Sequence, residues 1–212
     1  MKNIFTILAT SIAISTTVTA QTLDFSGLDT ALINSSSGQV FNWTAADSTT
    51  GTVTFKQLSG ETTLLLNGRG NDGLDFYHRT ASGAGSAVYQ FTFSSTVNIT
   101  VYGEEALGNA TFENVTLDTD GSDWNLLSST DLAYTDNGQQ FFEAYAATIG
   151  PGAAADYTIA SNSVQTLTWT YNYFGAEGAE AIGIDIIGSV PEPSSTALLG
   201  IGALGLIGRR KR

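Results

Sequence analysis

Alternation of apolar and polar residues is the dominant pattern in the middle of the chain. It recurs over residues 52–56, 89–94, 97–102, 166–173 and 182–187, where every second residue is aliphatic or aromatic and most of the others are short and polar. A period of two predicts strands with one buried face, and no helical period is sustained. Shorter stretches of strand-like composition lie at 39–44, 62–67, 110–118, 139–148 and 155–160.

Clusters of Gly, Ser, Asn, Asp and Pro separate these stretches, as at 35–38, 82–85 and 136–138, and they predict turns. About ten strands with one apolar face each are best buried as two antiparallel sheets packed face to face. We therefore expect residues 21–188 to form one all-β domain, an antiparallel β-sandwich of jelly-roll type.

The first 20 residues have the pattern of a secretory signal peptide. Lys2 supplies one positive charge, residues 4–14 are mostly apolar, and short side chains lie three and one positions before a cut between Ala20 and Gln21. Such a segment directs a chain to the Sec translocon and is then removed. We expect an N-terminal signal helix over 1–20, with Gln21 as the first residue of the exported protein.

The last part of the chain, residues 189–212, has three sections of different chemistry. The middle section, from Ser194 to Gly208, has 15 uncharged residues, which span roughly 22 Å as a helix. This is less than the ~20 residues that a bilayer core usually requires, so the predicted membrane helix suits a transient stop better than a lasting anchor. The basic end should stay on the cytoplasmic side. The sections are Pro191, Glu192 and Pro193; then Ser194 to Gly208; then Arg209, Arg210, Lys211 and Arg212.

The order of Pro-Glu-Pro, short apolar helix and basic cluster resembles the PEP-CTERM sorting signal. The resemblance is confined to this tail. It implies that Pro191, Glu192 and Pro193 form a motif recognised by a membrane-embedded exosortase after export through Sec. It also implies a Gram-negative host that makes exopolysaccharide, and delivery to the cell envelope, outer surface or exterior. Many unrelated domains carry such a tail, so it implies nothing about the activity of the β domain.

Charge and composition exclude several functions for that domain. Between residues 21 and 190 there are 19 acidic and 3 basic residues, a net charge of −16. A surface this acidic repels phosphate backbones, which excludes nucleic acid as a partner. The chain has no cysteine and one histidine, which excludes cysteine nucleophiles and multi-histidine zinc sites. We expect a protein that is not an enzyme.

One acidic loop is a candidate metal site. Asp118, Asp120 and Asp123 lie close together around Gly121, and closely spaced carboxylates on such a loop can bind Ca²⁺. The loop lacks the EF-hand spacing, so the alternative is a solvated acidic turn.

Two tryptophans are candidates for stacking on sugar rings. Trp124 follows the acidic loop directly and is the best candidate for an exposed binding aromatic, whereas Trp43 stands beside Phe41 and fits either surface or core. The third, Trp169, alternates with other apolar residues and is expected in the core.

Three functions remain open from the sequence. The first is a non-enzymatic surface or matrix protein associated with exopolysaccharide or biofilm. The second is a carbohydrate-binding module that uses a loop face with Trp124, with or without calcium. The third is a glycan-active enzyme, which would need two carboxylates across a cleft. Glu104 and Glu105 are neighbours on one predicted strand and must point to opposite faces, which disfavours that pair.

Overall fold

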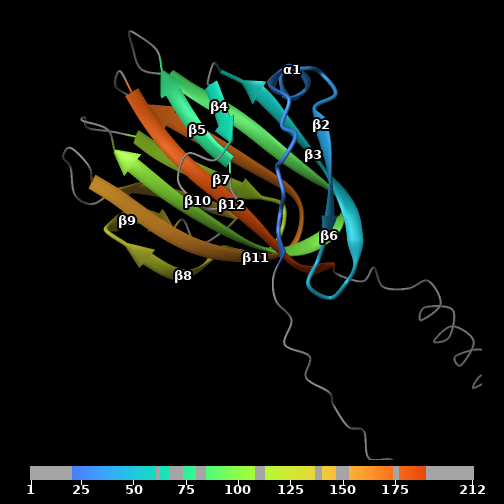
Figure 1. Ribbon diagram of the computed structural model, residues 1–212. Helices are drawn as coiled ribbons and strands as arrows, with labels where there is room; N and C mark the ends of the chain where they lie inside the picture. Colours follow the sequence, from blue (N-terminus) through green and yellow to red (C-terminus); the bar gives the residue numbers. More distant parts are fainter. Residues whose placement is uncertain are drawn as a thin grey trace, which may run out of the picture.

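The computed structural model describes residues 21–60, 63–66, 74–79, 85–107, 113–136, 140–146, 153–173 and 177–189. The predicted signal helix and membrane helix both lie outside the described residues. Antiparallel strands make up most of the described chain, together with one short helix (Figure 1). In chain order the elements are β1 (Gln21–Thr22), α1 (Thr30–Ile33), β2 (Gln39–Thr44), β3 (Thr50–Ser59), β4 (Thr63–Leu66), β5 (Leu74–Arg79), β6 (Gly85–Leu107), β7 (Glu113–Thr119), β8 (Asn125–Thr130), β9 (Leu132–Asp136), β10 (Phe141–Ala146), β11 (Ala153–Tyr173) and β12 (Glu177–Ser189).

The prediction of an all-β antiparallel domain is confirmed. The strand expected at 39–44 is β2, and those expected at 52–56, 62–67, 110–118 and 139–148 correspond to β3, β4, β7 and β10. The sequence did not predict β1, β5, β8 or β9. The jelly-roll topology is not confirmed, and the strands join in one continuous twelve-stranded sheet where two separate sheets were expected.

Two long strands connect the whole sheet, and each was predicted as two separate strands. The first part of β6 pairs with β3, whereas its second part pairs with β12. β11 runs antiparallel to β6 along its whole length, and their register shifts twice between Ser161 and Thr166. A shift of this kind is a β-bulge, which bends and twists the strand that carries it. The bend lets a single sheet turn back over its own apolar face.

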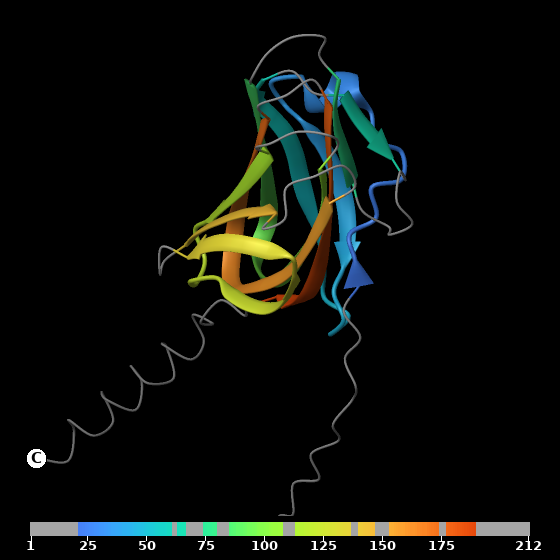
Figure 2. The ribbon, with the colours of Figure 1, turned by 90° about the vertical axis from the view of Figure 1, so that its left-hand side faces the viewer.

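The bends divide the sheet into two halves. The β7 half has the order β2-β3-β6-β11-β7-β10-β9, and the β12 half has the order β4-β5-β12-β6-β11-β8, with β1 also beside β12. Figure 2 shows the two halves curled around a common interior. The ring of Phe142 on β10 lies 5.6 Å from that of Tyr157 on β11, so side chains from both halves meet in the core.

Alternation of buried side chains explains why these residues form the core. On β6, Tyr89, Phe91 and Phe93 are at most 1% exposed, and Gln90 and Thr92 between them face outward. The rings of Phe55 and Phe91 stack at 4.5 Å between β3 and β6. Because buried aromatics contribute the largest apolar areas, this cluster supplies much of the folding free energy.

Candidate functional site

The sorting motif begins two residues after the last strand. β12 ends at Ser189, Val190 follows, and Pro191 opens the Pro-Glu-Pro motif. The motif residues, the uncharged stretch and the basic cluster Arg209, Arg210, Lys211 and Arg212 lie outside the described residues.

The N-terminal segment pairs with that same last strand. Gln21, the predicted first residue of the exported protein, lies opposite Ile186, and Thr22 lies opposite Asp185. The backbone N–H of Leu23 donates to the carbonyl of Ile184 at 2.8 Å. Ala20, on the other side of the predicted cut, lies outside the described residues. The two ends of the domain are therefore neighbours in space.

The predicted calcium loop has a different arrangement from a metal site. Within the ranges that the structure describes, no three His, Asp or Glu side chains group closely enough to hold a metal ion, and these ranges include Asp118, Asp120 and Asp123. One carboxylate oxygen of Asp120 accepts hydrogen bonds from the backbone N–H groups of Gln165 and Thr166, both at 2.8 Å. Its carboxylate therefore satisfies donors that the bulge in β11 leaves out of the ladder.

Neighbouring residues of the loop hold the same bend. The backbone N–H of Ser122 donates to the carbonyl of Asn162 at 2.7 Å, and the hydroxyl of Ser161 donates to the carbonyl of Ser122 at 2.6 Å. A Cβ on Gly121 would lie 2.5 Å from the carbonyl oxygen of Asn162, so the close approach of the two backbones requires glycine. Through these contacts the loop residues Asp120, Gly121 and Ser122 hold the bend of β11 in place. We call these three residues the corner clamp.

The prediction that Trp124 is exposed is wrong. Its side chain is 6% exposed, and its indole N–H donates to the carbonyl oxygens of Gln140 at 2.9 Å and Leu117 at 3.2 Å. A buried indole needs such partners, and here they tie the loop to β7 and to the start of β10. The ring has no free face for a sugar.

Trp43 is also part of the core. It is 4% exposed, and a Cβ on Gly51 of the neighbouring strand would lie 2.3 Å from its ring. The indole covers the glycine and leaves no room for a ligand. Trp169, expected in the core, is completely buried. All three tryptophans therefore stabilise the fold.

The register of the sheet brings together two acidic positions that the sequence could not place. Glu180 of β12 lies directly opposite Glu105 of β6, and Glu104 lies opposite Ala181. The side chains of these residues are not among those described. The pairing shows that the backbones of Glu180 and Glu105 are neighbours, and it does not show an enzymatic site.

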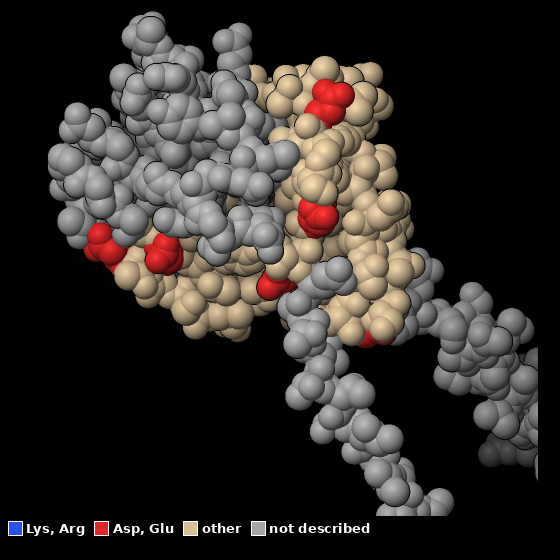
Figure 3. All heavy atoms as spheres, viewed as in Figure 1, with Lys and Arg blue, Asp and Glu red and all other residues tan. Residues whose placement is uncertain are grey.

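The face drawn in Figure 3 carries few charged side chains among the described residues. In Figure 3 the acidic side chains stand singly and do not form a continuous patch. The described part of the chain, which excludes the tail, contains no helix that is both long and apolar enough to span a bilayer. The structure describes an antiparallel all-β domain, and the sequence predicts a C-terminal sorting signal after it.

The family comparison identifies that signal. The model of the PEP-CTERM protein-sorting motif matches residues 189–212, so the resemblance seen in the sequence is confirmed for the tail. This motif implies export to the cell surface and processing by an exosortase. The match begins at Ser189, the last residue of β12, and covers no other residue of the β domain, and no curated protein matches the chain.

Proposed function

We propose that this chain is a non-enzymatic protein of the cell surface or extracellular matrix of a Gram-negative bacterium, and that its domain works within exopolysaccharide or biofilm. The observation that carries the proposal is the sorting motif directly after the last strand. The sequence-predicted signal peptide supports the same route through Sec. Asp120 of the corner clamp and the buried Trp43 and Trp124 support a structural role, because these candidate ligand residues stabilise the fold.

A fractionation experiment in the native host tests this proposal. Cytoplasmic membrane, outer membrane, matrix and medium would be probed for the domain in the parent strain and in a strain that makes no exopolysaccharide. We expect the domain in the matrix fraction of the parent and in the medium of the other strain. The same distribution in both strains would contradict a link to exopolysaccharide.

A carbohydrate-binding module is the second candidate, and one surface favours it. The outward-facing residues of the β7 half are short, polar and mostly uncharged, and the ladder places them in ranks across neighbouring strands. Thr54, Thr92 and Thr166 form one rank, and Lys56, Gln90, Thr168 and Asp118 form another, with a charged residue at each end. Hydroxyl and amide groups of this kind can donate to and accept from a neutral sugar. We call the uncharged part of this surface the polar face; it comprises Thr54, Gln90, Thr92, Asn114, Thr116, Thr166, Thr168, Thr170 and Asn172.

Hydrogen bonds order one end of the polar face. Asn172 donates through its side-chain amide to Asn114 at 2.6 Å, and Asn114 donates in turn to Glu143 at 2.8 Å. Calorimetry with neutral polysaccharides, with and without calcium, tests this candidate. Thr168→Lys and Thr170→Lys should abolish binding by covering the face, whereas Thr158→Lys, on the part of β11 in the other half, should leave it unchanged. An absence of binding by the parent protein would eliminate the candidate.

A further inference from the structure

Both ends of the domain lie at one end of the sheet, together with a tight turn. β1 begins beside the final residues of β12, and Figure 1 shows both at the lower end of the molecule. The turn between β2 and β3 lies there too, because a Cβ on Gly188 would lie 2.9 Å from the carboxylate of Asp47. We call this end the terminal pole; it comprises Gln21, Thr22, residues 45–49 and residues 185–189.

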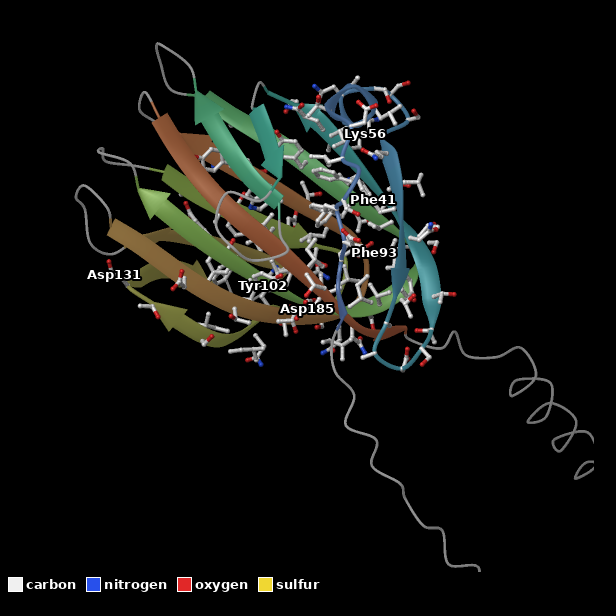
Figure 4. The ribbon with its side chains drawn as sticks, in the orientation of Figure 1. Phe41, Lys56, Phe93, Tyr102, Asp131 and Asp185 are labelled. Carbon is white, nitrogen blue, oxygen red and sulfur yellow. The ribbon has the colours of Figure 1, made fainter. Side chains whose placement is uncertain are left out.

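The opposite end carries the helix. Residues 30–37, with α1, lie at the upper end in Figure 1, and Lys56 lies beside them in Figure 4, whereas Asp185 lies lower, where β12 meets β1. β2 runs from one end toward the other, and its six residues span about 20 Å. Ser36, just before β2, and Ser48, just after it, are both exposed and mark the two ends.

The position of β12 in the sheet constrains when the domain can be completed. β12 is the last strand in the chain, yet it is an interior strand with β6 on one side and both β5 and β1 on the other. Ile182, Ile184 and Ile186 of β12 are at most 1% exposed and belong to the core. The core is therefore incomplete until the residues directly before the sorting motif have crossed the membrane. At that moment the uncharged stretch of the tail is the next part of the chain to enter it.

The linker between β12 and that stretch is very short. From Ser189 to Ser194 there are five residue steps, which extend to at most about 18 Å. The N-terminal end is fixed to the same pole, because Leu23 and Phe25 are each 2% exposed in the core directly after β1. Because the short linker leaves the domain at the terminal pole, the domain cannot turn another of its faces to a membrane that contains the tail.

We propose that the terminal pole faces a lipid surface while the tail is in the bilayer, so that the domain completes its fold against the membrane with its α1 end directed outward. This inference rests on the proposed export and sorting. The pole has little affinity for lipid of its own: its described side chains include Asp47 and Asp185 and no Lys or Arg. Anionic headgroups would repel these carboxylates, so the tether alone holds the domain there and its cleavage releases the domain.

The chain has no cysteine, which allows a clean labelling experiment. Ser48→Cys at the terminal pole and Ser36→Cys near α1 form a matched pair of exposed serines in turns. Each variant of the full chain, with its signal segment removed, would carry an environment-sensitive fluorophore and be reconstituted in phosphatidylcholine and phosphatidylglycerol vesicles. Vesicles with a nitroxide on the lipid headgroup would then quench any fluorophore close to the membrane.

We expect quenching several-fold stronger at position 48 than at position 36. A 20-residue Gly-Ser linker inserted between Val190 and Pro191 adds a mean reach of roughly 25 Å and should remove most of the difference. Equal quenching at both positions in vesicle-bound protein without the linker, or stronger quenching at position 36, would overturn the orientation and leave sorting intact. Failure of the protein to float with vesicles would overturn membrane insertion of the tail, and the orientation with it.

Discussion

The hydroxyl of Thr22 donates a 2.7 Å hydrogen bond to the carboxylate of Asp185 and joins β1 to β12. The contact connects positions 163 residues apart in sequence. It places the start of the described domain beside the strand that precedes the sorting motif. On the proposed export route, the segment that would leave the translocon first pairs with the strand that would leave it last, which would link export and folding at one point of the molecule.

The segment after β1 should be essential for stability. The ring of Phe25 lies 5.4 Å from Phe41, 6.0 Å from Phe55 and 6.1 Å from Phe91. Because Phe25→Ala would leave a cavity among these rings, we expect it to lower the free energy of unfolding by about 3–5 kcal/mol, measured by urea denaturation. Leu32→Ala is the control, since Leu32 is 46% exposed and should change stability by less than about 0.5 kcal/mol. Equal effects of the two substitutions would contradict the packing of Phe25.

The corner clamp predicts a stability effect that is independent of calcium. Asp120→Ala removes the acceptor of two backbone N–H groups at the bulge in β11 and should cost about 2 kcal/mol. Asp123→Ala, three residues along the same loop and also exposed, should have little effect. Thermal unfolding would be measured for both variants and for the parent.

The same measurement separates the clamp from a metal site. Addition of calcium or of a chelator should leave the melting temperature of the parent unchanged. A rise of several degrees with calcium, lost in both aspartate variants, would instead support coordination by the loop.

A glycine on β12 should be coupled energetically to a tyrosine on β6. Gly183 lies opposite Tyr102, and a Cβ on the glycine would lie 1.8 Å from the tyrosine ring. Gly183→Ala must displace that ring, at a cost of about 1–3 kcal/mol. In a Tyr102→Ala background the glycine substitution should cost much less, and a double-mutant cycle from denaturation curves measures the difference. Additive effects would show that the ring does not lie over the glycine.

Much of the strand pattern could be predicted from sequence because buried and exposed positions alternate in it. β8 was missed for the opposite reason, since all its residues except Leu126 are exposed and no period-two pattern arises. β6 was predicted as two strands because Ser94, Ser95 and Thr96 interrupt its apolar alternation, and β11 because its bulges put buried Val164 out of phase with the buried residues on both sides. Continuity across a bulge depends on the partner strand, which local sequence does not specify.

Of the candidate sites, too, some could be predicted from the sequence and others could not. The sorting motif is a contiguous string with its chemistry in order, so the sequence was sufficient to identify it. The acidic loop was ambiguous because its decisive partners, Gln165 and Thr166, are about 45 residues away. Trp124 stands next to acidic residues in sequence, yet its indole points to carbonyl groups of β7 and of the segment before β10. Polar neighbours in the chain are a poor guide to exposure where a loop folds back over a core.

Replacement of Pro191, Glu192 and Pro193 by alanine in the native host is the most direct test of the central claim that this tail sorts the domain. The β domain ends before the motif, so the variant should fold normally. Immunoblots of membrane, surface and medium fractions would report both the size and the location of the protein. We predict that the variant stays in the membrane fraction with its tail uncut, whereas the parent is processed and reaches the surface or the medium. Processing and location identical to those of the parent would contradict the account.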